Sequence, residues 1–458
     1  MEGIRVIKDY KINLVNLTPL KIGNGKDELD LLIDKNTKKP IILGSSIAGA
    51  IKNYLMDLKL ENDVKEFLGE NSKQLHNEKK DLANNKKIST ESKIYISDTY
   101  GNQLKISSRA GIKRDYKYGT SEDKKKYDVD YIDSDIEFEM NFKLFAKDTS
   151  ELKKEDQLMK NIIEGFKSGN LRLGANKMFG FGKFEVKKIE IREFDLEDRD
   201  DLISYILDDK KYNILNLNDF DNIKRHGYIE FDFTGSIIDS MIVKQIPQNK
   251  EVDYVNMVNS KDESIIPGTT IKGLFREYNT KILKTLNLED KLFLVEDIYG
   301  TNANSEQEEH KIGKILTSDV VVKNPKYCVY NRIKVDRFTG GVVTGGKFDE
   351  ERVQGDIGFR ISLKKLEENN KAAVGLILLT FRDLGLSKLP IGSSSSIGAG
   401  RIKGNKLTIK ENDKVVKIEF ENGKLICNDM DYVNEAIKAI KNIAKPNDNG
   451  SEGNKKDE

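Results

Sequence analysis

The feature that most limits the fold of this 458-residue chain is an internal repeat of about 220 residues. The segment PIILGSSIAGAIKN, residues 40–53, returns as SIIPGTTIKGLFRE, residues 264–277, and the match places Gly44 against Gly268. The other three matches, in the same order in both halves, are residues 93–98 with 314–319, 112–119 with 333–340, and 173–186 with 391–402. Four matches in register predict a tandem duplication of one domain.

The repeat sets the expected domain boundaries. We predict a first domain over residues 1–190, a connector over residues 191–225 and a second domain over residues 226–444. Residues 72–92 are polar and are expected to be a surface insertion, and the tail over residues 445–458 is expected to be disordered. Apolar residues at helical spacing predict a short helix in the connector, and they are Leu202, Ile203, Ile206 and Leu207.

Composition narrows the function classes. The 77 Lys and Arg balance 76 Asp and Glu, so net charge alone neither indicates nor excludes a nucleic-acid partner. His76, His226 and His310 are far apart, which excludes a His-rich metal site and argues against serine or cysteine triads. The isolated Cys328 and Cys427 suit a reducing compartment. Because we find neither a secretory signal nor a membrane-spanning run, we expect a cytoplasmic protein with no membrane partner.

Each copy alternates strand-like and helix-like periodicity. Apolar residues recur at helical spacing over residues 44–58 and 268–283. Each run begins with Ser or Thr residues that can cap a helix. The pattern predicts an α+β fold made of two tandem ferredoxin-like domains of the split βαβ type, the layout also found in RNA-recognition modules. The segments expected to be strands include residues 10–23, 136–146, 228–241 and 374–382.

A glycine-rich loop near the end of each copy is the first candidate binding element. Glycines allow close approach of another chain and expose N–H groups to a phosphate. A tight turn is the alternative for a single Gly-x-Gly, whereas two copies flanked by Lys or Arg favour contact with an RNA backbone. The candidate residues are Gly174, Lys177, Gly180, Gly182 and Lys183 in the first copy and Gly392, Gly398, Gly400 and Arg401 in the second.

The two helix starts are the second candidate element, because free amides at a helix N-terminus bind phosphate oxygens. Ordinary capping by Ser or Thr is an alternative that can hold at the same time. Lys272 and Arg276 share one helical face and add positive charge, although a solvated charged face is equally compatible with them. The candidate residues are Gly44, Ser45, Ser46 and Lys52 in the first copy and Gly268, Thr269, Thr270, Lys272 and Arg276 in the second.

These motifs resemble the RAMP superfamily of CRISPR-associated proteins and are most similar to the repeated backbone subunits of type III effector complexes. The helix starts, the segment VDRFTGG at residues 335–341 and the glycine loops carry the resemblance, which covers nearly the whole chain. It implies that each domain grips guide RNA and inserts a β-hairpin thumb that displaces one nucleotide. Residues 335–341 and 112–119 match the segment leading into that thumb. Arg337 and Phe338 suit stacking on a splayed base, unless Phe338 belongs to the core.

The resemblance also implies a cutting aspartate on the loop before the first helix of each domain. Asp30 and Asp253 fit that position, and Asp27 and Glu28 lie within reach of the same loop. The RNA would supply its own 2′-OH nucleophile, and the carboxylate would hold Mg²⁺ (or Mn²⁺) or act on that hydroxyl. An inert surface carboxylate is the alternative. Four other aspartates recur at strand ends and turns and are expected to be structural, namely Asp98, Asp115, Asp319 and Asp336.

The implied function is a subunit that binds guide RNA and cleaves complementary target RNA, with other RAMP subunits and a large subunit as partners. A non-catalytic scaffold stays open, since the first copy has Leu43 and Ala48 where the second has Pro267 and Lys272. A guide-processing ribonuclease ranks lower, because no histidine lies in a recurring motif. A small-molecule enzyme ranks last, because we find no dinucleotide or P-loop signature.

Overall fold

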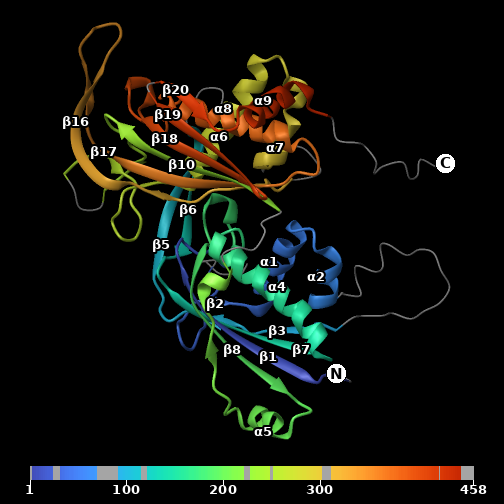
Figure 1. Ribbon diagram of the computed structural model, residues 1–458. Helices are drawn as coiled ribbons and strands as arrows, with labels where there is room; N and C mark the ends of the chain where they lie inside the picture. The colour runs from blue at the N-terminus through green and yellow to red at the C-terminus, as the bar shows by residue number, and fades with distance from the viewer. Residues whose placement is uncertain are drawn as a thin grey trace, which may run out of the picture. The chain divides into compact units, whose positions relative to one another are not determined.

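The computed structural model describes residues 3–23, 31–69, 91–114, 121–220, 227–247, 251–301, 311–421 and 423–444. The chain divides into two compact units, Met1–Gly227 and Tyr228–Glu458 (Figure 1). The insertion expected over residues 72–92 lies almost entirely, and the tail over residues 445–458 entirely, outside the described residues. Among the helices of the described ranges, none is long and apolar enough to cross a membrane.

The first unit is built on an antiparallel sheet with the strand order β3-β7-β1-β8-β9. In chain order the four main strands come as β1, β3, β7 and β8, so the sheet has the 2-3-1-4 arrangement of a split βαβ fold. The alternating burial of β7 shows why the sequence pattern was informative, since every second residue faces the helices. The strands are β1 (Val6–Asn16), β3 (Ile94–Ile96), β7 (Glu137–Ala146), β8 (Phe184–Asp195) and β9 (Asn213–Ile214).

Three helices cover one face of this sheet (Figure 1). They are α1 (Gly44–Asp57), α2 (Glu61–Leu68) and α4 (Thr149–Ser168). Between them and the sheet, Phe138 and Phe166 each place a ring edge-on against Phe184, with ring centroids 5.7 and 6.2 Å apart. These buried rings form part of the apolar core between the helices and the sheet.

The second unit repeats this arrangement with the strand order β14-β17-β10-β18 and two further strands, β19 and β20, at one edge. Its core contains clustered phenylalanines: the Phe381 ring stacks on that of Phe231 and meets the Phe275 ring edge-on, with the latter two ring centroids 4.9 Å apart. The tandem ferredoxin-like fold predicted from the repeat is therefore confirmed. The strands are β10 (Tyr228–Ile238), β14 (Ile315–Leu316), β17 (Val342–Lys364), β18 (Arg401–Glu411), β19 (Lys414–Glu421) and β20 (Lys424–Cys427).

One predicted element of the second unit is wrong. Residues 374–382 were expected to be a strand but lie inside helix α8 (Asn370–Gly385). The sheet contacts one side of α8 and helix α9 (Met430–Ala439) contacts another, so nearly every α8 side chain is buried. A helix buried all round shows a continuous apolar run without a stripe, and such a run looks like a buried strand. The other helices of this unit are α6 (Gly268–Thr285) and α7 (Phe293–Tyr299).

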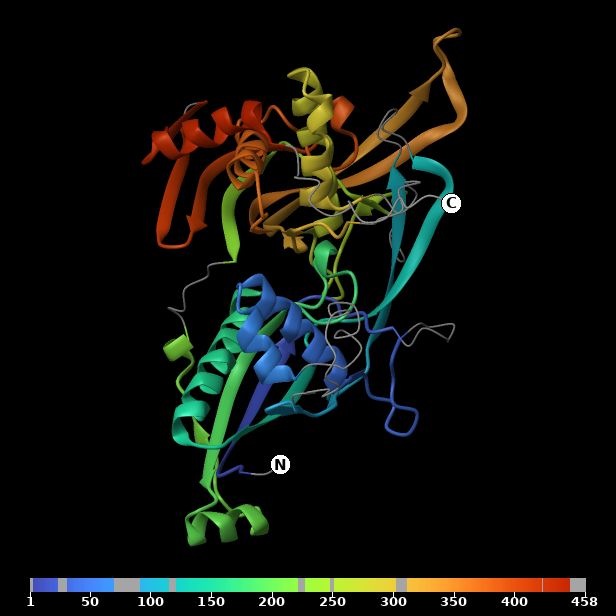
Figure 2. The ribbon, with the colours of Figure 1, turned by 90° about the vertical axis from the view of Figure 1, so that its right-hand side faces the viewer.

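Each unit carries a long β-hairpin inserted after the edge strand that follows its first helices, β3 in the first unit and β14 in the second. In the first unit β5 (Ile106–Arg114) pairs with β6 (Ser121–Ile132), and in the second β16 (Lys323–Val335) pairs with β17. All β16 side chains are exposed or half-buried, and the hairpin stands away from the rest of its own unit (Figures 1 and 2). Residues 336–341, expected to lead into such a hairpin, form its tip. The described part of the other segment, residues 112–114, ends strand β5.

The segment expected to be a connector adds to the first unit. Strand β8 runs through residue 190 to Asp195, and β9 pairs with it. Between them lies the expected short helix, α5 (Arg199–Leu207). It has no buried residue, although Asp201 accepts from the Asp195 amide at 3.0 Å and the Tyr205 ring centroid lies 5.2 Å from that of Phe194. The apolar spacing therefore identified a helix but did not identify a buried face.

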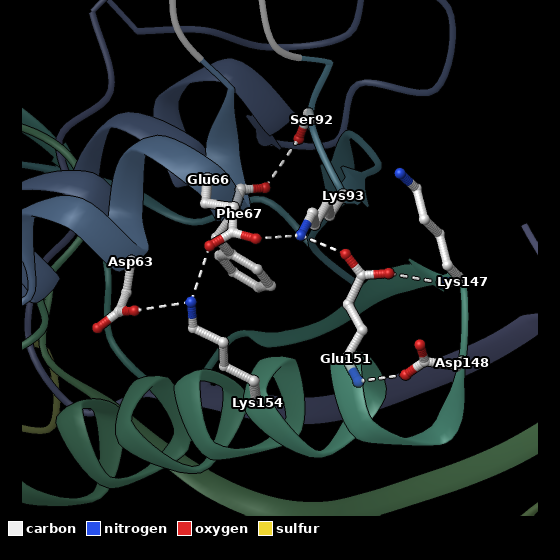
Figure 3. A network of polar contacts seen from close by, with 9 residues as sticks. All are labelled: Asp63, Glu66, Phe67, Ser92, Lys93, Lys147, Asp148, Glu151 and Lys154. Atoms are coloured by element: carbon white, nitrogen blue, oxygen red, sulfur yellow. Dashed lines mark hydrogen bonds and ion pairs between the residues drawn. The ribbon is translucent and has the colours of Figure 1, made fainter. Parts of the chain in front are cut away.

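The ends of the polar insertion are joined by described residues. The Lys93 amide donates to the Phe67 carbonyl oxygen at 3.0 Å. Figure 3 shows that the Glu66 carboxylate accepts from Lys93 at 2.6 Å and from Lys154 of α4 at 2.7 Å, while Lys93 also pairs with Glu151. This polar network ties α2 and the start of β3 to α4 independently of the residues between them.

Candidate nucleic-acid interface

An aspartate caps each of the two predicted helix starts. The Gly44 amide donates to Asp98 Oδ1 at 2.7 Å, and the Gly268 amide donates to Asp319 Oδ1 at 2.9 Å. The structural role expected for these two recurring aspartates is confirmed. Leu43 and Pro267 are the N-cap residues, neither with a side-chain cap, so the expected capping by Ser or Thr is wrong.

These caps make phosphate binding at the two helix starts less favourable. The Ser46 and Thr270 amides donate to the carbonyl oxygens of the residues before Gly44 and Gly268, and a carboxylate already lies at each N-terminus. A second anion there would be repelled by that carboxylate. Gly44 and Gly268 are buried, whereas the side chains of Ser45, Ser46 and Thr269 are exposed and that of Thr270 is half-buried.

The basic row expected on α6 is also altered by burial. Lys272 is only 8% exposed, and burial, with a smaller contribution from the Arg276 charge, lowers the pKa of its ammonium to about 8. Arg276 and, in the first unit, Lys52 are half-buried. Lys272 therefore faces the interior. Of the two basic residues expected on this face of α6, only Arg276 is partly exposed.

The glycine loops fold back on their own units in the same way in both copies. The Gly182 amide donates to the Pro19 carbonyl and the Gly400 amide to the Ser240 carbonyl, each at 2.8 Å. A Cβ atom on Gly182 would lie 1.9 Å from the Leu173 carbonyl oxygen, and Gly182 has φ of +75°. The glycine is required because the loop approaches its own backbone, and its amide is not available to a phosphate.

The other candidate residues of the glycine loops range from buried to exposed. Burial lowers the pKa of the Lys177 ammonium, and Lys183 is half-buried. Arg401 is exposed and pairs with Asp239. Gly180 is buried, Gly398 is exposed, and Gly174 and Gly392 are half-buried.

The tip of the second hairpin presents the candidate stacking residues. Asp336 accepts hydrogen bonds from the Phe338 and Thr339 amides at 2.9 and 2.8 Å, which hold the pKa of its carboxyl below the usual value. This turn leaves the Phe338 side chain 99% exposed, with Arg337 also exposed beside it. Phe338 is therefore not a core residue, and the structural role expected for Asp336 is confirmed.

Asp253 lies against the base of the same hairpin. Its Oδ2 accepts the Asp349 amide of β17 at 2.8 Å, and the residue is exposed. Asp30, Asp27, Glu28 and Asp115 lie outside the described residues. Among the side chains that the structure describes, no group of three or more His, Cys, Asp or Glu is placed to hold a metal ion.

A buried ion cluster at the hairpin base was missed in the sequence. Glu350 is 1% exposed and accepts from Lys244 and from Arg352, both at 2.6 Å. Burial opposes ionisation of Glu350, but the two cations outweigh it and lower the pKa of its carboxyl. Ser394 of the glycine loop donates to the same carboxylate at 3.3 Å, and Lys244 lies 4.8 Å from the ring centroid of Tyr254, next to Asp253. The cluster thus brings together the hairpin base, the glycine loop and the aspartate loop.

In the first unit, aromatic rings join the hairpin base to the glycine loop. The Arg109 guanidinium of β5 lies 5.7 Å from the Tyr131 ring centroid and 6.0 Å from that of Phe181, in the glycine loop. The Tyr131 and Phe181 rings meet edge-on at 5.5 Å. Comparing the two copies position by position could have found these residues, since Arg109 and Tyr131 correspond to Tyr330 and Arg352.

The chain is a tandem repeat of one class of domain. Each unit has a ferredoxin-like fold and an inserted hairpin that is joined at its base to a glycine loop. The sequence pattern of the RAMP superfamily matches residues 13–185 and 233–403, one region in each unit. The chain belongs to the RAMP superfamily.

Other comparisons add little to this assignment. Curated proteins gave no match, whereas 223 chains of solved structures did. One is a chain of the type III-B Cmr-β bound to cognate target RNA, solved by cryo-electron microscopy, which is 17% identical with a TM-score of 0.30. That alignment covers 40% of this chain and 60% of the other, and at this TM-score it supports no conclusion about function.

Proposed function

We propose that this chain is an RNA-binding subunit of a type III CRISPR ribonucleoprotein and that its hairpins and glycine loops contact guide RNA. The observation that carries the proposal is the second hairpin. Residues 323–347 contain six Lys or Arg and one acidic residue, in a chain whose net charge is +1. They form an exposed ribbon with Phe338 at its tip. Cations that bind phosphates, beside a ring on which a base can stack, are the usual elements of single-strand recognition.

The backbone amides contribute less than the sequence suggested, because the glycine loops and helix starts use many of them internally. Side-chain cations therefore make the phosphate contacts in this proposal. The partners would be guide RNA, complementary target RNA, other RAMP subunits and a large subunit, as the sequence resemblance implies.

The proposed reaction is cleavage of the target RNA beside Asp253, and by analogy beside Asp30. The 2′-oxygen attacks the adjacent phosphorus, the bond from phosphorus to the 5′-oxygen breaks, and the 2′-OH proton is removed while the leaving oxygen gains one. The products are a 2′,3′-cyclic phosphate and a 5′-hydroxyl. Asp253 offers one carboxylate oxygen, Oδ1, in addition to the one bonded to the Asp349 amide. A Mg²⁺ or Mn²⁺ ion would therefore take most of its ligands from RNA and water, as Mg²⁺ commonly does.

A non-catalytic scaffold is the second candidate. The hydrogen bond from the Asp349 amide favours it, because the Asp253 carboxylate also fastens its loop to the hairpin base.

The experiment separates the two roles of Asp253. The variant Asp253→Asn keeps an oxygen that can accept the Asp349 amide but removes the charge. With the reconstituted ribonucleoprotein, complementary RNA and Mg²⁺, we expect Asp253→Asn and Asp30→Asn each to abolish one product band while guide binding is retained. The matched control is Asp262→Asn, an exposed aspartate in the same loop. Cleavage unchanged in both variants would select the scaffold, and protein that carries no RNA when purified from its host would refute RNA binding itself.

A further inference from the structure

The base of each hairpin holds an arginine over a tyrosine ring. In the first unit the Arg109 guanidinium carbon lies 5.7 Å from the Tyr131 ring centroid. In the second unit the Arg352 guanidinium carbon lies 4.7 Å from the Tyr330 ring centroid. Both distances are within the range at which a cation is attracted by the face of an aromatic ring.

The two pairs occupy the same two positions with the residues exchanged. Single bridges join Leu20 to Ile132 in the first unit and Met241 to Val353 in the second, and both partners are displaced by 221 residues. With the same displacement, Arg109 corresponds to Tyr330 and Tyr131 corresponds to Arg352. The cation has moved from the first hairpin strand to the second, and the ring has moved in the opposite direction. Retention of the pair despite a change at both positions indicates that the pairing itself is required.

Each pair is also fastened to the glycine loop of its own unit, by different chemistry. In the first unit the link is aromatic, since the Arg109 guanidinium lies over the ring of Phe181 and the Tyr131 ring meets that ring edge-on. In the second unit the link is ionic, since Arg352 pairs with Glu350, which accepts from Ser394. On β17 of the second hairpin, Glu350 and Arg352 near the base are buried, with Arg352 2% exposed, whereas the β17 residues toward the tip are exposed or half-buried.

We propose that these arginine–tyrosine pairs are positioning residues that set the direction of each hairpin relative to its glycine loop. The inference rests on the proposed function, because it makes hairpin and loop one rigid surface for a single RNA strand. A hairpin fixed only by its two strands would pivot at its base, and an RNA chain contacting both elements would then lose part of its binding free energy to ordering them. Neither pair needs to touch RNA for this effect.

The test uses the first unit, where the buried Asp133, whose carboxyl interacts with the Arg109 charge, is kept unchanged in every variant. Four forms of the full chain are compared with the parent, namely Arg109→Leu, Tyr131→Leu, the double exchange Arg109→Tyr with Tyr131→Arg, and the control Tyr212→Leu. The control removes the ring 4.5 Å from the Arg192 guanidinium, a cation–ring contact of the same unit outside the hairpin. The measurements are hydrogen–deuterium exchange of β5 and β6 amides, the unfolding midpoint, and affinity for a labelled single-stranded RNA.

We expect both single variants to speed exchange in β5 and β6, but not in β1, and to weaken RNA binding by about 5–20-fold, as the loss of a partly buried cation–ring contact would. The double exchange should restore both quantities to near the parent values, and the control should alter neither. Unchanged hairpin exchange in the single variants, or failure of the double exchange to restore it, would overturn the proposal. Faster exchange with unchanged RNA affinity would show that the pairs serve stability alone. If the parent does not bind RNA, the proposed function fails, and hairpin exchange still decides whether the pairs fix the hairpin.

Discussion

The buried carboxyl of Glu155 gives the sharpest prediction about stability. This residue lies on α4 and is 2% exposed, and neither of its oxygens has a hydrogen-bond partner among the described residues. Its neighbours belong to the network of Figure 3, where Lys93 is already paired with Glu66 and Glu151, and Lys154 with Glu66. Burial, with a smaller contribution from the Glu151 charge, raises the pKa of Glu155 from 4.5 to about 8.

The magnitude follows from the difference between the folded and unfolded pKa values. In the unfolded chain Glu155 releases its proton near pH 4.5, whereas in the folded chain it retains the proton until about pH 8. Between these values each pH unit lowers the free energy of unfolding by about 1.4 kcal/mol, and below pH 4.5 the residue has no such effect. At pH 7 the penalty is therefore roughly 3 kcal/mol. Glu155→Gln imitates the protonated form and should remove it.

The assay is urea unfolding of the full chain, followed by circular dichroism from pH 5 to pH 9. The gain in stability of Glu155→Gln over the parent should be small at pH 5, should grow toward pH 8 and should level off above it. The second unit carries no substitution, so its transition is an internal reference. Glu151→Gln is the matched control one turn earlier. Because Lys93 and the Lys147 amide together outweigh burial and lower the pKa of Glu151, that variant should lose stability at pH 7.

Two results would refute this reasoning. Equal stability of parent and Glu155→Gln at pH 7 would mean that the carboxyl is hydrated or paired in solution. A gain that is largest at pH 5 and vanishes at pH 8 would have the wrong sign for a raised pKa. The second unit offers a precedent for an uncharged residue here, because the position 218 residues later is the buried Ala373.

The remaining predictions concern the glycine loops and the helix caps. Gly400→Ala should destabilise the second unit by about 3 kcal/mol or more, because its Cβ would lie 2.0 Å from the Ile391 carbonyl oxygen at φ of +84°. Gly398→Ala should cost only about 1 kcal/mol, since it has positive φ but no atom within 4 Å of the new Cβ, and equal losses in urea unfolding would contradict the packing argument. Asp319→Ala should lower the free energy of unfolding by about 1–2 kcal/mol, whereas Asp319→Asn keeps an acceptor for the Gly268 amide and should lose less. A loss as large for Asp319→Asn as for Asp319→Ala would show that charge, and not the hydrogen bond, stabilises the start of α6.

The sequence was sufficient to predict the architecture because the same patterns of apolar residues occur in both copies of the domain. Strand β10 repeats the periodicity of β1 and helix α6 repeats that of α1, and this duplication predicted two domains of one fold. Helix α8 was missed because α9 covers the side that would otherwise carry polar residues. A Cβ on Gly375 would lie 2.3 Å from the Ala436 carbonyl oxygen, so the two helices approach very closely. Such contacts between distant segments leave no local periodicity to detect.

The candidate site was harder to predict because a backbone amide can bind a phosphate only if it is not already hydrogen-bonded within the protein. The sequence indicated which amides could be free, namely those of the helix starts and glycine loops. In the structure the Gly44 and Gly268 amides donate hydrogen bonds to aspartates, and the Gly182 and Gly400 amides donate to backbone carbonyl oxygens. The partners of the last two lie about 160 residues earlier in the chain, so only the fold could reveal them.

The same comparison explains why the exposed hairpin carries most of the proposed function. An element that folds on the protein must satisfy its own polar groups, and the helix starts and glycine loops do so internally. Strand β16 pairs along one edge only, to β17, and its side chains lie exposed or half-buried outside the core. Exposed apolar side chains there, including Val329 at 47% and Phe338 at 99%, bring no benefit to the folded unit and gain only if a partner covers them. In the proposed function, the five net positive charges of residues 323–347 would attract the phosphates of an RNA partner. Apolar exposure and positive charge on one ribbon together favour a nucleic acid with unstacked bases over either a purely apolar or a purely acidic partner.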